Sequence, residues 1–157
     1  MKTIELTQGK VALVDDVDYV YLMQWKWQAH TSRTSWRPTR RTRVEGKWTS
    51  RYMYHDIAER MGMRTAIVDH VDQNPLNNRR SNLRAATYSQ NGHNCGPRQR
   101  STTGVKGVSF HKEKHKYHAQ IQVASKKYHV GYYKTLAEAA VAIQKKRQEL
   151  VGEFACA

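Results

Sequence analysis

Residues 68–91 read "VDHVDQNPLNNRRSNLRAATYSQN", and this stretch decides how the first part of the chain is organised. An apolar run ends in Asp69 and His70, and the residues after it are mostly Asn, Pro and Arg. Asn and Pro favour turns, so we expect a buried strand, a loop and a second strand at "NLRAAT". Thr87 and Gln90 have the spacing of a capping box, which predicts a short helix directly after Thr87.

The polar residues of this stretch have the chemistry of a catalytic site. Asp is a hard oxygen ligand that suits a divalent cation such as magnesium. His is the side chain best able to take a proton from water near pH 7. An isolated Asp-His pair is more often structural than catalytic. Here the order strand, loop, strand, helix is expected to bring Asp69 and Asn91 to one point with His70 beside them.

The charge of the chain indicates a polyanionic partner. Its 157 residues include 27 Lys and Arg against 13 Asp and Glu, which gives a net charge of +14 and a pI near 10.0. A small chain this basic most often binds nucleic acid, although a basic surface without a partner is the alternative. Hydrophobic residues make up 39% of the chain, enough for a packed core.

The cysteines and the apolar runs point to a protein that works inside the cell. Cys95 and Cys156 form no CxxC pair, so neither a zinc knuckle nor a disulfide framework is expected. No apolar run approaches the roughly 18 residues that span a membrane. The first ten residues lack the apolar stretch of a signal peptide. We expect an intracellular, cytoplasmic protein, not secreted and without a membrane partner.

Before residue 68 the pattern is rich in strands. "TIEL", "KVALVD" and "WKWQAH" have the composition of short strands, with a helical turn between Asp16 and Gln24. "SWRPTRRTRVEGKWTSRYMY" predicts a hairpin that turns at "EGK", and "HDIAERMG" predicts a short helix that ends near Gly62. Arginines on one face of the hairpin either contact phosphates or guard a sheet edge. They are Arg37, Arg41 and Arg43.

After a Gly- and Ser-containing linker at residues 95–103, three amphipathic strands precede a helix. "GVKGVSFHK", "KYHAQIQVA" and "KKYHVGYYK" are the strands, and "TLAEAAVAIQKKRQELVG" is the helix, with a capping box at its start. Alternation assigns Tyr128, Val130 and Tyr132 to an apolar face that the helix covers. The opposite, polar face could enter a DNA groove or could be an ordinary solvated surface.

Residues 3–94 resemble the HNH nucleases, whose ββα-metal core would cover about residues 66–94. The segments that carry the resemblance are "YHDIA", "VDHVDQNPLNNRRSNLRAATYSQN" and, nearer the N-terminus, "TQGKVALVDDVDY". The resemblance implies that Asp69 and Asn91 hold a divalent metal ion, Mg²⁺ or else Mn²⁺. It also implies that His70 is the general base and that Asn82 braces the loop and orients His70.

Several neighbouring side chains complete this expected site. His93 or Asn94 could share the metal, and His55 is expected to be structural. Three arginines flank the site and could clamp phosphates, although a solvated basic loop would look the same. They are Arg79, Arg80 and Arg84.

Residues 104–154 resemble the APETALA2-like DNA-binding domain, a three-stranded antiparallel sheet packed on one helix. The resemblance rests on "GVKGVSFHKEKHKYHAQIQV" and "YHVGYYKTLAEAAVAI". It implies that the polar sheet face contacts DNA. The positions that match are Lys106, Gly107, Gln120, Gln122, Lys127 and His129. Because Gln120 and Gln122 replace a Glu and an Arg of the plant proteins, their target sequence does not transfer.

The sequence therefore predicts an α+β protein with an HNH nuclease domain at 1–94 and a DNA-binding domain at 104–157. The expected function is metal-dependent hydrolysis of double-stranded DNA by a monomer, as in homing or mobile-element endonucleases. Two alternatives stay open: a DNA-binding regulator with a degenerate nuclease fold, and a nuclease directed at RNA.

Overall fold

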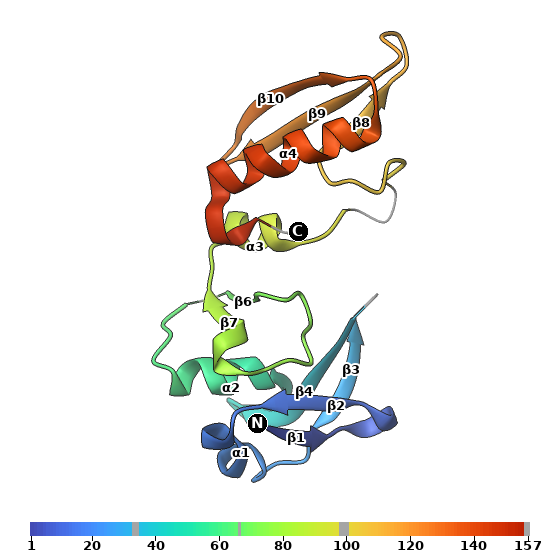
Figure 1. Cartoon of the computed structure of the whole chain (residues 1–157). Coiled ribbons are helices and arrows are strands. Elements are labelled where there is room, and N and C mark those ends of the chain that lie inside the picture. Colours follow the sequence, from blue (N-terminus) through green and yellow to red (C-terminus); the bar gives the residue numbers. More distant parts are fainter. Residues whose placement is uncertain (33–34, 66, 98–100, 156–157) are drawn as a thin grey trace. The chain divides into compact units, whose positions relative to one another are not determined.

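The computed structural model describes residues 1–32, 35–65, 67–97 and 101–155 (Figure 1). They form two compact units, Met1–Ala86 and Thr87–Ala157, and each is described by itself. Ala66 in the predicted strand, residues 98–100 in the predicted linker and Cys156 lie outside the described residues. Within the described part of the chain, no helix is long and apolar enough to cross a membrane.

The first unit opens with an antiparallel hairpin, β1 (Lys2–Glu5) and β2 (Val11–Val14), joined through the short 3-10 turn η1 (Thr7–Gly9). Helix α1 (Asp16–Leu22) follows where the sequence predicts a helical turn. The alternating pattern of the strands places Ile4, Ala12 and Val14 in the core.

A three-stranded antiparallel sheet comes next, in the order β3 (Gln28–Ser32), β4 (Ser35–Val44), β5 (Lys47–Tyr52). β4 and β5 form the predicted hairpin, and its turn has positive φ at Glu45 (48°) and Gly46 (80°). "WKWQAH" is a strand only from Gln28 onward, and the indole of the buried Trp27 donates to the Leu22 carbonyl at the end of α1.

Helix α2 (Met53–Arg60) starts two residues before the predicted segment, and Gly62 with φ 74° follows its end. Its apolar side meets strands and α1 in a single core. The buried apolar residues of that core are Ile4, Leu6, Ala12, Val14, Leu22, Trp27, Ala29, Met53, Ile57 and Leu83.

Two short antiparallel strands, β6 (Val68–His70) and β7 (Leu83–Ala85), enclose the Asn-rich loop. The loop ends in the 3-10 turn η2 (Arg80–Asn82). It is tied to β2 by two backbone hydrogen bonds: Leu13 N–H donates to the Leu76 carbonyl, and Asn78 N–H donates to the Leu13 carbonyl. The loop is therefore fixed to the body of the first unit at its middle.

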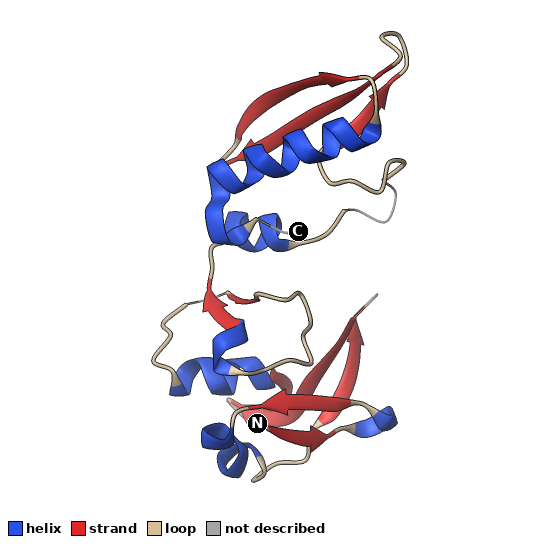
Figure 2. Cartoon of the chain, in the orientation of Figure 1, coloured by secondary structure: helices blue, strands red, loops and turns tan. Residues whose placement is uncertain are grey.

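The second unit contains α3 (Tyr88–Asn94), the sheet β10-β9-β8, helix α4 (Leu136–Val151) and the 3-10 turn η3 (Gly152–Phe154). The strands are β8 (Val108–His111), β9 (Lys116–Val123) and β10 (Lys126–Tyr133). Both predicted capping boxes, Thr87 with Gln90 and Thr135 with Glu138, are present. Helix α4 lies along one face of the sheet (Figure 2).

The prediction for the end of β10 is wrong in one respect. A β-bulge between His129 and Gly131 shifts the register, so Tyr132 pairs with His118 and Tyr133 pairs with Tyr117. Tyr133, not Tyr132, packs against the core under α4. One extra residue in a strand reverses the facing of every residue after it, and simple alternation misses this.

Candidate functional site

Strand β6 carries Asp69 and His70, and both residues are buried. Asp69 is 4% exposed and His70 is 9% exposed. Asp69 Oδ2 accepts from Arg84 Nε at 2.9 Å and lies 2.8 Å from Arg84 Nη2. The two residues face each other across the β6–β7 pair. A buried carboxylate is thus balanced by a guanidinium on the neighbouring strand.

The His70 ring is fixed by an asparagine that the sequence prediction did not single out. Its Nε2 lies 3.2 Å from Asn78 Oδ1, and Tyr54 packs edge-on against the ring with centroids 5.4 Å apart. Asn78 is fully buried, and its Nδ2 donates to the Pro75 carbonyl at 3.0 Å. Asn78 Oδ1 therefore faces the imidazole as an acceptor, which places the ring proton on Nε2 and leaves Nδ1 as the basic nitrogen.

Burial lowers the pKa of His70, outweighing the hydrogen bond with Asn78 and the charges of Asp72 and Asp69, which raise it; the positive charge of Arg37 lowers it slightly further. The neutral form of the ring, which a general base needs, therefore dominates at neutral pH.

Asn82 is the main brace of the loop. Its Nδ2 donates to Asp72 Oδ1 at 2.8 Å and to the Asn77 carbonyl at 2.7 Å, and its Oδ1 accepts from the Asp72 backbone at 3.0 Å. Asn77 Nδ2 also donates to Asp72 Oδ2 at 2.7 Å. These bonds set the path of the chain that carries Asn78. Any effect of Asn82 on His70 through this path stays a prediction.

The three arginines near the site have different partners. Arg80 makes two hydrogen bonds to the buried Asp18, at 2.7 and 2.8 Å, and Arg60 donates to the same carboxylate at 2.8 Å. Arg84 pairs with Asp69, and Arg79 Nε donates to Asn77 Oδ1 at 3.0 Å. Arg80 thus holds the first unit together, and phosphate contact by any of the three stays a prediction.

Asn91 lies on α3 in the second compact unit, whereas Asp69, His70 and Asn82 lie in the first. Their meeting at one metal ion therefore stays a prediction. On α3, His93 and Asn94 are 8% and 4% exposed, while Asn91 is half-buried. Burial, followed by the charges of Lys106 and Arg147, lowers the pKa of His93.

The donor chemistry of the predicted metal ligands is consistent with a hard divalent ion. The carboxylate of Asp69 and the side-chain amide of Asn91 both offer oxygen, the donor that Mg²⁺ prefers. Among the described residues, no three His, Cys, Asp or Glu side chains gather into a group that could hold a metal.

Comparison with known proteins places this geometry in a family. Residues 64–93, which span β6, the braced loop, β7 and most of α3, match the HNH endonuclease family model. Protein 3.8 of Escherichia phage T7 is 36% identical over 88 residues, which cover 56% of this chain and 72% of that protein. Residues 64–93 of this chain thus belong to the HNH endonuclease family.

A second relative is an uncharacterized HNH endonuclease of Acanthamoeba polyphaga mimivirus. It is 34% identical over 105 residues, which cover 67% of this chain, and the chain spans about half (54%) of its length. No solved structure matches the chain.

The second unit presents the predicted DNA-contacting residues on one side of its sheet. The face turned away from α4 carries Gln120, Gln122, Lys127 and His129, all exposed. We call this the polar sheet face. A hollow of about 550 Å³ on this unit is lined by Lys106, Gly107 and the first three of these residues, among others. The structure thus brings together residues that lie up to 21 positions apart in the chain.

The bulge adds an aromatic cluster to the polar sheet face that alternation did not predict. The Tyr132 ring stacks on His118 with centroids 4.9 Å apart, and His118 Nε2 lies 2.9 Å from His129 Nδ1. Lys114 Nζ lies 3.9 Å above the Tyr132 ring. The sequence signal that could have found this cluster is Gly131, because a glycine within a strand often marks a bulge.

The arginines of β4 divide by partner. Arg41 and Arg43 are exposed, and Arg37 is half-buried. Arg43 Nε donates to the Gly46 carbonyl at 2.9 Å, and the Arg41 guanidinium lies 5.8 Å from the Trp48 ring centroid. Arg40 instead pairs with the buried Asp56 at 2.9 Å. DNA contact by Arg37, Arg41 and Arg43 stays a prediction.

Proposed function

We propose that the protein is a metal-dependent DNA endonuclease that hydrolyses phosphodiester bonds. The observation that carries the proposal is the buried Asp69-His70 pair, in which burial lowers the pKa of the histidine and Asn78 orients its ring. It lies within the segment that matches the HNH endonuclease family. The strongly basic composition supports a nucleic acid substrate.

His70 is the proposed general base. Nδ1 takes a proton from the attacking water, and Nε2–H is held by Asn78 Oδ1 during the transfer. A fixed ring keeps the basic nitrogen aligned with the attacking water, which is the positional contribution to the rate. Asn82 maintains the loop that carries Asn78.

Asp69 and Asn91 are the proposed holders of a divalent ion, Mg²⁺ or Mn²⁺. Such an ion, when bound, stabilises negative charge on the phosphate and on the leaving oxygen. In the structure Arg84 shares the Asp69 carboxylate and offsets its charge. With one histidine base, one strand is cut at each visit, so nicks are expected as often as double-strand breaks.

The second unit is proposed to bind duplex DNA through its polar sheet face, as an APETALA2-like domain would. Gln120 and Gln122 are exposed on that face and are proposed to contact base edges, and the exposed Lys127 is proposed to contact phosphates. A homing or mobile-element role would follow from a nuclease unit joined to a target-binding unit.

The test is plasmid cleavage by the full chain with Mg²⁺. Wild-type protein should nick or linearise the plasmid, and His70→Ala and Asp69→Asn should abolish cleavage while retaining the native circular dichroism spectrum. His30→Ala removes an exposed histidine from β3 and should cleave normally. Cleavage by all variants alike would show that the activity comes from elsewhere. Tight duplex binding with no cleavage in Mg²⁺ or Mn²⁺ would favour a DNA-binding regulator.

A further inference from the structure

A single lysine closes the C-terminal end of α3. Lys106 Nζ donates to the carbonyls of Gly92 at 2.6 Å, His93 at 3.1 Å and Cys95 at 2.5 Å. The last carbonyls of a helix have no partner within the helix, and the helix dipole makes this end negative. The Lys106 ammonium group supplies donors for these carbonyls, and its positive charge balances the negative end of the helix dipole.

Helix α3 depends on such an anchor because it is short. It has seven residues, and helices below about 12 residues are marginal in water without tertiary contacts. The Thr87–Gln90 capping box closes its N-terminal end. Lys106 closes the other end from a position 12 residues beyond Asn94, the last residue of the helix.

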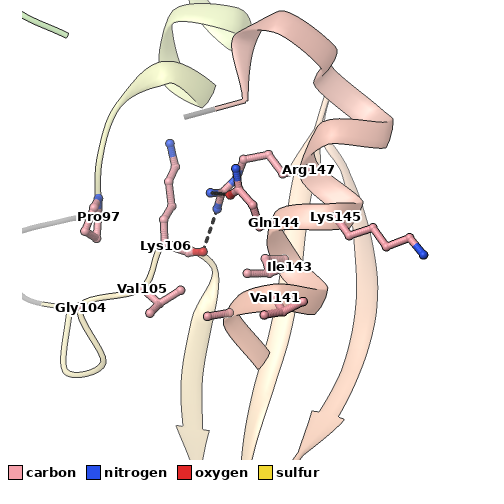
Figure 3. A pocket seen from close by; sticks show the side chains of 10 residues that line it. Pro97, Gly104, Val105, Lys106, Val141, Ile143, Gln144, Lys145 and Arg147 are labelled. Carbon is pink, nitrogen blue, oxygen red and sulfur yellow. Dashed lines mark hydrogen bonds between the residues drawn. The ribbon is translucent and has the colours of Figure 1, made fainter. Parts of the chain in front are cut away.

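Lys106 is itself held by α4. Arg147 is 4% exposed, and its Nη2 donates to the Lys106 carbonyl at 2.8 Å, while its Nη1 donates to Gln144 at 3.2 Å. Figure 3 shows the hydrogen bond from Arg147 to the Lys106 carbonyl. The Lys106 side chain points away from this bond, toward α3. A continuous set of contacts thus runs from α4 through Lys106 to the end of α3.

The residue after Lys106 leaves little freedom at this point. Gly107 has φ 80°, and a Cβ there would lie 2.5 Å from the Gln120 carbonyl oxygen. The backbone is therefore packed closely on β9, and the start of the Lys106 side chain is fixed on the sheet. Lys106 belongs to a built contact and not to a freely moving surface.

We propose that Lys106 is a positioning residue for DNA cleavage, which it supports by holding α3 and with it Asn91. This inference rests on the proposed function, in which Asn91 is a metal ligand. In this proposal the Lys106 ammonium group serves the helix, in place of the DNA contact that the sequence predicts for it. The second unit then contributes to the reaction as well as to target binding.

The test uses Lys106→Met in the full chain, because methionine keeps an unbranched stem without the charge. We expect kcat to fall about 10- to 100-fold, the usual cost of losing a group that orients a metal ligand. The Mg²⁺ concentration for half-maximal rate should rise, the DNA Kd should change little, and α3 amides should exchange hydrogen faster. Lys106→Arg should restore part of the rate.

Lys145→Met is the matched control, because Lys145 is an exposed lysine of the same unit, on α4. It should leave kcat, the DNA Kd and α3 exchange unchanged. If Lys106→Met instead loses DNA affinity at constant kcat, or leaves α3 exchange unaltered, the inference is overturned. Absence of cleavage by wild-type protein would overturn the proposed function itself, a result distinct from normal cleavage by Lys106→Met.

Discussion

His70 Nε2 lies 3.2 Å from the side-chain oxygen of Asn78, a fully buried residue eight positions along the chain. The bond fixes the tautomer and the plane of the proposed base at once. It also links the β6 strand to the middle of the Asn-rich loop, which β2 holds in place.

Asn78→Ala should therefore impair cleavage without removing any group that touches the substrate. We expect kcat to fall about 100-fold, the scale of a misplaced catalytic group. The free energy of unfolding should fall by about 1–3 kcal/mol, because a buried hydrogen-bond partner is lost. Rates are measured well below the unfolding midpoint. Asn74→Ala, an exposed asparagine of the same loop, is the control, and an equal loss of kcat there would refute a specific role for Asn78.

The buried carboxylate of Asp18 forms ion pairs with both Arg60 and Arg80 in the first unit. Asp18→Asn should lower the free energy of unfolding by about 3–5 kcal/mol, because two partly buried guanidinium groups lose their counter-charge. Urea unfolding measures the change. Asp16→Asn breaks only an exposed pair with the N-terminus and should leave the unfolding midpoint where it is. A mild effect of Asp18→Asn would mean that water compensates the arginines.

The strand–loop–strand–helix order and the Asp69-His70 pair follow from the sequence, because turn residues and capping boxes act locally. The partner of His70 does not, because five asparagines lie between residues 74 and 91 and only the folded loop selects Asn78. The partners of Arg147 and Arg80 were equally hidden, since each residue pairs across a long sequence separation. The β-bulge in β10 moves Tyr132 from the predicted apolar face to the polar sheet face, and simple alternation does not predict a bulge.

The ion pairs of Asp18 with Arg60 and Arg80 also make the free energy of unfolding depend on pH in the acid range. Burial alone would raise the pKa of Asp18, but hydrogen bonds from Arg80 and Arg60 outweigh it and hold the pKa below 3.8. A carboxyl with a lowered pKa contributes stability above its unfolded pKa and loses it as pH falls through the folded pKa. Wild-type protein should thus lose stability below about pH 4 more steeply than Asp18→Asn. Parallel curves of unfolding free energy against pH for the two proteins would contradict this.

Gly107→Ala should destabilise the second unit through two separable effects. The residue has φ 80°, and an added Cβ would meet the Gln120 carbonyl oxygen at 2.5 Å. Gly104→Ala is the matched control, because its φ is 67° but nothing lies within 4 Å of its Cβ site. Gly104→Ala should cost about 1 kcal/mol for the backbone conformation alone, and Gly107→Ala clearly more. Equal losses in thermal unfolding would show that the strand moves to admit the methyl group.

Lys127 and Lys126 offer a test of the polar sheet face by adjacent residues of one strand. Lys127 pairs with Gln122 on that face, whereas Lys126 Nζ lies 5.3 Å from the ring centroid of Tyr128, a residue of the core side. Lys127→Gln should weaken duplex binding at every sequence and reduce the salt dependence of log Kd by about one ion. Lys126→Gln, with the same change in net charge, should have a smaller effect. If both variants shift Kd and its salt slope equally, DNA binding by the second unit depends on overall charge and not on this face of the sheet.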